Sequence, residues 1–212
     1  MKDFSPLAPV APAGGALAES LYGKGPTGNI LRTLILVPEE ACRLISLVSH
    51  QYIPATQLLD FNADSRHALS RAQIEVVASK VSDRNQCFYW TTWHTYLLRE
   101  SGKAAMIDYI LAGAIDPSID SGVEHGCELV TFASSVAGSD RAALDAARRV
   151  LRERIGAPVA VTASLIAANF SMLDRVANAI CISVDAMIIK PSAEFRAQLG
   201  IKNYPSAANT LR

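Results

Sequence analysis

Three side chains that can carry out acid–base or nucleophilic chemistry lie close together in the sequence: Glu75, Cys87 and His94. In an α-helix, Cys87, His94 and either Trp90 or Thr91 would share one face, so a thiol, an indole and an imidazole would line the same strip. Cys87 would lie in the first helical turn, where the positive end of the helix dipole favours the thiolate. His94 can accept or donate a proton, and Glu75 can orient it from the preceding helix. The spacing therefore predicts a cysteine–histidine–glutamate relay.

Each of these residues also has an ordinary structural interpretation. Free cysteines are often buried in cores, and a histidine on an apolar helix face is usually a core residue with satisfied hydrogen bonds. Glu75 has polar neighbours and fits a solvated helix position. The other three cysteines lie among apolar residues and are predicted to be buried: Cys42, Cys127 and Cys181. No histidine has metal-ligand spacing, so we expect no metal site and no cofactor.

Two helices must position the three reactive side chains. A capping box begins at Ser70, and apolar residues then recur at helical spacing, which predicts a helix over 71–82. A second capping pattern begins at Asp83 and predicts a helix over about 87–100. Because only a short polar turn separates the two segments, we expect a helical hairpin.

The rest of the chain also has helical rather than strand periodicity, which predicts an all-α fold. Further helices are expected over 38–53, 103–114, 121–137, 140–155 and 158–189. The last of these contains no internal glycine or proline after Pro158, and one apolar stripe along it is predicted to be buried: Val161, Leu165, Ala168, Met172, Val176 and Ile180.

Breaker residues divide the chain into three parts. Residues 1–28 are rich in proline, alanine and glycine and are predicted to form an arm that is flexible or docks on a partner. Residues 29–190 form the predicted helical domain. Residues 191–212 are expected to be a C-terminal extension that lies over the body of the protein or over a partner.

Composition narrows the class of protein and its partners. The chain has 212 residues, half of them hydrophobic, and its 20 basic and 20 acidic residues give no net charge. Such a chain can bury a core without disulfides, and its neutrality excludes nucleic acid and anionic membrane surfaces as expected partners. It begins without a signal-peptide pattern and has no unbroken apolar stretch of about 20 residues, so we expect a cytoplasmic protein.

Two further groups of residues suggest contacts. Five aromatic residues fall within nine positions, more than one core face needs, so some are predicted to contact another subunit or a ligand: Phe88, Tyr89, Trp90, Trp93 and Tyr96. Asp174 and Arg175 are predicted to form a buried ion pair that orders the bundle.

The segment Ser82–His94 resembles the signature of the carboxymuconolactone decarboxylase and alkylhydroperoxidase D superfamily, particularly its peroxidase-related branch. That signature has a glutamate twelve residues before the first cysteine of a CxxC pair and a histidine four residues after the second cysteine. Three of these four positions are occupied in this chain, by Glu75, Cys87 and His94.

The resemblance extends to both ends of the helical domain. The segment Gly28-Asn29-Ile30-Leu31 is similar to the family's opening helix, and two segments are similar to its closing helix: Asn169-Phe170 and Asp174-Arg175-Val176-Ala177. The resemblance implies an alkylhydroperoxidase-D-like helical bundle in which a central hairpin carries the site. It also implies assembly into a closed homo-oligomer.

Trp90 stands where the family's redox enzymes carry the second cysteine. Those enzymes reduce hydroperoxides with one thiolate and resolve the sulfenic acid with the other, so their dithiol cycle cannot close within this motif. The resemblance therefore implies a one-cysteine hydroperoxide reductase that would use Cys87, His94 and Glu75 together with an outside thiol reductant.

Two alternatives stay open. The decarboxylase side of the superfamily uses acid–base chemistry, which Glu75 and His94 could perform on a small carboxylated or cyclic substrate. Trp90 and Thr91 would then line the substrate pocket. In the other alternative, Trp90 fills the cavity and the protein is a structural or ligand-binding member of the fold without catalytic activity.

Overall fold

The described part of the chain consists of helices and the turns that connect them. A computed structural model describes residues 27–54, 57–61, 65, 67–101, 116 and 118–211. Its α-helices are α2 (Asn29–Leu34), α3 (Pro38–Gln51), α4 (Arg71–Arg84), α5 (Phe88–Ser101), α7 (Gly126–Val136), α8 (Arg141–Arg154), α9 (Ala157–Ala179), α10 (Ala186–Ile189) and α11 (Ala193–Gln198). Two 3₁₀ helices follow, η3 (Ile201–Asn203) and η4 (Pro205–Asn209). No strand occurs within these ranges, which confirms the all-α class.

Two sequence predictions fall largely beyond the described ranges. The predicted arm over 1–28 is described only from residue 27, and the predicted helix over 103–114 lies entirely outside the described residues. Nothing in the structure tests either prediction.

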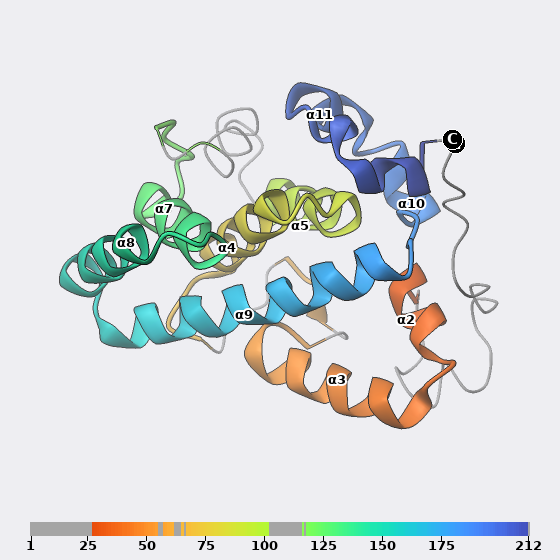
Figure 1. Ribbon diagram of the computed structural model, residues 1–212, viewed down its shortest axis with the longest axis horizontal. Helices are drawn as coiled ribbons and strands as arrows, with labels where there is room; N and C mark the ends of the chain where they lie inside the picture. The colour runs from red at the N-terminus through yellow and green to blue at the C-terminus, as the bar shows by residue number, and fades with distance from the viewer. Residues whose placement is uncertain are drawn as a thin grey trace.

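Helix α9 runs along the length of the molecule, and α3, α4, α5, α7 and α8 pack against it (Figure 1). The α4–α5 hairpin lies along one side of α9 and α3 along another, while α7 and α8 lie towards the N-terminal end of α9. The first helix of the hairpin, α4, packs against α5, α7 and α9. Eleven of its residues are buried, so α4 forms the centre of the fold.

The predicted hairpin is present, but its turn is built differently from the prediction. The capping box at the start of α4 is complete, because Ser70 and Gln73 bond each other's backbone N–H. The predicted cap at Asp83 is wrong: α4 continues past it, and its carboxylate binds Lys80 and Tyr204 instead. The first N–H of α5 is satisfied by the hydroxyl of Ser206, 2.9 Å away, from the C-terminal segment.

The C-terminal segment therefore lies on the body of its own chain. Helices η3 and η4 pack against α5, and the Ser206 hydroxyl also donates to the carbonyl of Gln86 at 2.7 Å. Gln86 has a left-handed backbone (φ 49°), which makes the turn from α4 to α5 tight. The hydrogen bond from Ser206 holds the carbonyl of this turn residue.

Two predicted helix boundaries are wrong. The helix predicted over 158–189 ends at Ala179, and the chain then turns at Cys181, whose φ of 55° is left-handed. No glycine or proline signals this end. The helix predicted from 121 begins only at Gly126, after a left-handed His125. Left-handed residues other than glycine are uncommon, and helical periodicity does not predict them.

The apolar stripe predicted to be the buried face of α9 is partly exposed. Val161 is 60% exposed and Leu165 is 44% exposed, whereas the core face of α9 carries Ala163, Ile166 and Phe170. The prediction failed because α9 is apolar on more than one side, so periodicity alone could not identify the buried face. Among the described helices, α9 is also long and apolar enough to cross a membrane by length and composition alone. Half of its most apolar window is nevertheless buried, and core helices pass the same test.

The cluster of aromatic residues is partly explained inside the chain. Tyr89 and Trp93 are buried and donate hydrogen bonds to one carboxylate oxygen of Asp185, at 2.8 and 2.7 Å. The other oxygen accepts from the backbone N–H of Asn29 at 2.6 Å. Asp185 thus joins α2, α5 and the segment after α9, and these two aromatic residues face the protein interior rather than a partner.

Two of the predictions about buried side chains also need correction. Cys42 is exposed, and Cys127 and Cys181 are only partly buried, so the prediction that all three are core residues is wrong. Arg175 is exposed and donates to the carbonyl of Ser171 at 2.7 Å, and the structure contains no ion pair between it and Asp174.

Candidate functional site

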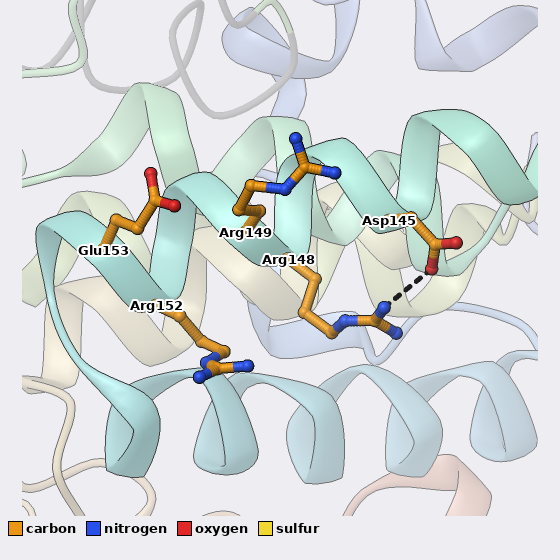
Figure 2. A pocket seen from close by; sticks show the side chains of 5 residues that line it. All are labelled: Asp145, Arg148, Arg149, Arg152 and Glu153. Carbon is orange, nitrogen blue, oxygen red and sulfur yellow. Dashed lines mark hydrogen bonds and ion pairs between the residues drawn. The ribbon is translucent and has the colours of Figure 1, made fainter.

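The surface of α8 has a hollow, but this hollow is not the candidate site. It is lined by Asp145, Arg148, Arg149, Arg152 and Glu153, none of which the sequence singles out (Figure 2). Arg148 pairs with Asp145 at 2.8 Å, and the arginine side chains are exposed to solvent. Exposed charges have little tendency to acquire unusual reactivity.

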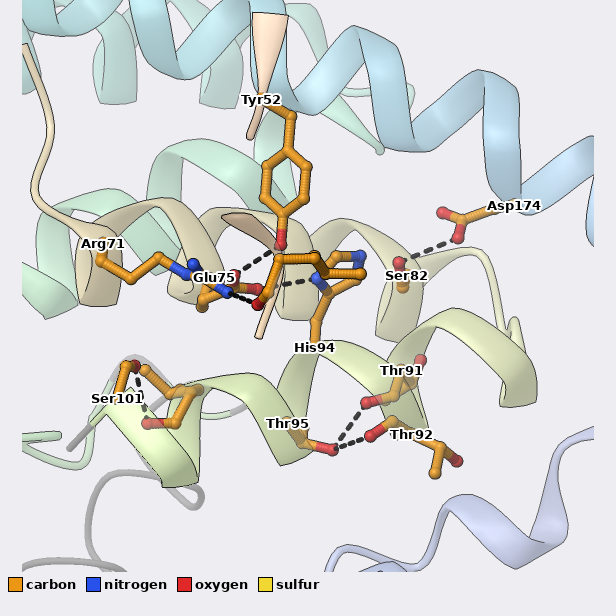
Figure 3. Close-up of polar contacts among 12 residues, drawn as sticks. Tyr52, Arg71, Glu75, Ser82, Thr91, Thr92, His94, Thr95, Ser101 and Asp174 are labelled. Atoms are coloured by element: carbon orange, nitrogen blue, oxygen red, sulfur yellow. Dashed lines mark hydrogen bonds and ion pairs between the residues drawn. The ribbon is translucent and has the colours of Figure 1, made fainter. Parts of the chain in front are cut away.

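The polar group between α3, α4 and α5 is centred on the Glu75 carboxylate (Figure 3). One oxygen, Oε1, accepts hydrogen bonds from the Tyr52 hydroxyl at 2.5 Å and from Arg71 Nε at 2.8 Å. The other oxygen, Oε2, lies 2.8 Å from His94 Nδ1. Glu75 and His94 are fully buried, and Arg71 is 8% exposed. Buried charges need such pairing, and the contact between Arg71 and Glu75 is a buried ion pair.

This geometry sets the tautomer of His94. A carboxylate oxygen accepts hydrogen bonds, so the contact with Glu75 Oε2 assigns a proton to His94 Nδ1. In the neutral form of the ring, the lone pair is then on Nε2. That atom is fully buried, and no described residue forms a hydrogen bond with it. His94 is therefore held by one nitrogen, and its other nitrogen has no partner in the described part of the chain.

Aromatic rings enclose the imidazole. The Trp90 ring stacks on His94 with centroids 5.4 Å apart and planes 19° apart, and Phe170 approaches edge-on at 4.1 Å. Trp90 is partly buried, and its indole N–H donates to the carbonyl of Leu173 at 3.2 Å. Trp90 thus forms a fixed wall against one face of the ring, and chemistry at His94 is confined to the ring edge.

Tyr52 and Arg71 belong to this group, although the sequence analysis did not identify them. Arg71 precedes Glu75 by four residues, the spacing of a helical ion pair, so a signal was available. Tyr52 lies just beyond α3, and no local pattern connects it with Glu75. Burial, reinforced by the Glu75 charge, raises the pKa of Tyr52 well above its usual value, so the phenol stays protonated and donates to the carboxylate.

Cys87 does not belong to the polar group around Glu75 and His94. It is fully buried, and burial, together with the nearby Asp174 carboxyl, raises the pKa of its thiol well above the usual value. The expectation that the start of the helix would favour the thiolate is therefore wrong, because desolvation outweighs the helix dipole. Neither Glu75 nor His94 forms a hydrogen bond with Cys87. Seven residues separate Cys87 from His94, which is about 10 Å along the helix.

A second buried carboxyl belongs to the hairpin turn. Asp174 on α9 accepts hydrogen bonds from the Ser82 hydroxyl and the Asn85 amide, both at 2.8 Å. Burial raises the pKa of Asp174 to about 7, although these donors and the Cys87 thiol lower it in part. Asp174 therefore has both protonation states available near neutral pH.

The structure thus brings together two of the three predicted catalytic residues, Glu75 and His94, with Trp90 beside them. Thr91 is fully buried, and its hydroxyl has no hydrogen-bond partner in the described part of the chain. The same residues contain no group of three or more histidine, cysteine, aspartate or glutamate side chains that could hold a metal ion.

Comparison of the chain with known proteins found no matching family model, no similar curated protein and no similar solved structure.

Proposed function

We propose that the protein is an acid–base enzyme in which His94 Nε2 exchanges a proton with a small substrate. One observation carries this proposal: His94 is fixed through Nδ1 by a buried carboxylate, while Nε2 is buried without a partner among the described residues. A histidine that is held at one nitrogen and free at the other is the usual arrangement of a general base.

Each neighbour of His94 has a distinct part in this chemistry. When Nε2 takes a proton, the imidazolium that forms lies beside Glu75, whose negative charge stabilises it. Arg71 and the Tyr52 hydroxyl both donate to Oε1 of Glu75 and fix the position of the carboxylate. Burial strengthens these electrostatic contacts because little water screens them.

The substrate class that we propose is a small carbon acid, such as a lactone or a β-keto acid. Trp90 lies against the imidazole face, so a flat substrate could stack beside the indole while its acidic hydrogen reaches Nε2. The segment Ser82–His94 resembles a superfamily whose decarboxylase side uses acid–base chemistry, which supports the same class. No thiol is needed for this reaction.

A one-cysteine hydroperoxide reductase has less support. The attacking species in such an enzyme is the thiolate, and burial raises the pKa of the Cys87 thiol. In addition, His94 donates to Glu75 rather than to the sulfur. We therefore expect Cys87 to act as a structural residue of the hairpin turn.

The test compares His94→Asn with Cys87→Ser on lactones and β-keto acids. We expect His94→Asn to lower kcat/KM by about 10²- to 10⁴-fold, because the proton-exchanging atom is lost, and Cys87→Ser to change it only a few-fold. A sulfenic-acid probe applied after mild peroxide treatment should leave Cys87 unlabelled. Full activity in His94→Asn would contradict the acid–base proposal. Labelling of Cys87, with loss of thiol-dependent peroxide turnover in Cys87→Ser, would support the reductase instead.

We also propose that the protein forms a homo-oligomer through the exposed apolar stripe of α9, which we define as Val161, Leu165 and Ala168. These residues are exposed on one helix, and burying apolar side chains against a second copy is favourable. We expect Leu165→Glu to lower the molar mass measured by light scattering, whereas Met187→Glu, at an exposed position on α10, should not. A monomeric wild-type protein, or an unchanged mass in Leu165→Glu, would contradict this interface.

A further inference from the structure

A line of polar side chains continues along α4 from the acid–base site. Glu75, Ser79 and Ser82 are spaced i, i+4 and i+7, so they lie on one face of the helix. Glu75 at one end contacts His94, and Ser82 at the other end donates to Asp174. Ser79 lies between them and is fully buried, and its hydroxyl has no hydrogen-bond partner among the described residues.

The free nitrogen of His94 lies on the same side as this line. In Figure 3 the imidazole turns one nitrogen towards Glu75, and the other lies on the side of Ser82 and Asp174. Glu75 and Ser82 are seven residues apart, which is about 10 Å along α4. No single hydrogen bond spans that distance, so any connection between His94 and Asp174 needs intermediate groups.

Two unpaired polar atoms, His94 Nε2 and Ser79 Oγ, thus lie along the interval between two fully paired carboxyl groups. Buried polar atoms in native proteins are nearly always paired with protein groups or with ordered water. Buried water typically forms about three hydrogen bonds to otherwise unsatisfied groups of this kind. The Ser79 hydroxyl can also both accept and donate, as a proton path requires.

We propose that Asp174 exchanges a proton with His94 through the Ser79 hydroxyl and buried water. The imidazolium gives up the proton on Nε2, the water and the Ser79 hydroxyl each accept one proton and pass on another, and the Asp174 carboxylate receives the last. The products are a neutral imidazole and a carboxylic acid, and no electrons are transferred. This role rests on the proposed acid–base function for its catalytic meaning, because Asp174 would store the proton that His94 removes.

Among the described residues, few charged or titratable groups face His94 and Asp174. His94 faces Glu75 and Arg71 from α4 and Tyr52 from the segment after α3. Asp174 faces the Cys87 thiol from the hairpin turn, and Arg175 beside it on α9 points to solvent. The pKa of Asp174, about 7, allows it to hold the proton near neutral pH.

The test follows the ¹⁵N resonance of His94 Nε2 by NMR as the pH is raised, and it requires no substrate. In the wild type we expect this resonance to shift with a midpoint near the pKa of Asp174. Asp174→Asn should abolish that step. Ser79→Ala should remove most of it, because the hydroxyl that connects the two groups is lost.

Thr92→Val is the matched control. Thr92 is also fully buried with an unpaired hydroxyl, and its side chain points away from His94 in Figure 3. We expect this variant to retain the full step, and circular dichroism should show that all three variants are folded.

Two results would overturn the proposed path. If Ser79→Ala retains the wild-type step, the coupling acts through space rather than through hydrogen bonds. If Asp174→Asn leaves the step unchanged, Asp174 is not coupled to His94. Failure of the acid–base function would look different from either result. Turnover would then be unchanged in His94→Asn, while the wild-type protein would still show the NMR step.

Discussion

Glu75→Gln is expected to lower the free energy of unfolding by about 3–5 kcal/mol, the usual effect of removing one partner from a buried ion pair. Glutamine preserves the size of the side chain and can still accept from Tyr52. It carries no charge, however, so the guanidinium of Arg71 is left 8% exposed without its counter-ion. Equilibrium denaturation in urea measures this change. The turnover of Glu75→Gln should also be lower than that of the wild type, as we expect for His94→Asn.

The double variant Arg71→Met with Glu75→Gln shows whether the lost stability comes from the unpaired charge of Arg71 or from the altered side-chain packing. Removing both charges should recover much of the lost stability, because no buried charge is then left unpaired. Turnover should stay low, since His94 still lacks the carboxylate that stabilises its protonated form. If Glu75→Gln alone were as stable as the wild type, the ion pair between Arg71 and Glu75 would not contribute to stability as predicted.

Asp174→Asn is expected to make the protein less sensitive to pH. The pKa of Asp174 is raised from 3.8 to about 7, so the folded state holds a proton that the unfolded state releases at lower pH. This contribution is fully present below pH about 4 and is lost as the pH rises through about 7. It amounts to about 4 kcal/mol for a shift of about three units.

The measurement is the free energy of unfolding of both proteins from pH 4 to 8. The wild-type value minus the variant value should fall steadily over this range, and the variant should become relatively more stable at the alkaline end. Asp145→Asn is the control, since Asp145 forms surface ion pairs whose loss costs less than about 1 kcal/mol. A wild-type-minus-variant difference that does not change with pH would contradict a buried, protonated Asp174.

The pairing of Glu75 with His94 was predictable from the sequence. A complete capping box fixes the start of α4, and a short turn fixes how α5 returns along it. In an antiparallel hairpin the second helix returns along the first, and Glu75 and His94 each lie about two helical turns from the turn, so local signals bring them to a similar level. Cys87 could not form part of the same contact, because it lies at the turn end of the hairpin and His94 lies two helical turns further along.

The sequence by itself determined the all-α class, the hairpin and the approach of Glu75 to His94, because capping and 3.6-residue periodicity are local properties. Only the tertiary structure decided which groups complete the site and which protonation states they adopt. Tyr52 reaches Glu75 from 23 residues away, and Asp174 reaches Ser82 from 92 residues away. The pKa of Cys87 depends on burial by the whole fold, and desolvation of this kind is not encoded in the spacing of neighbouring residues.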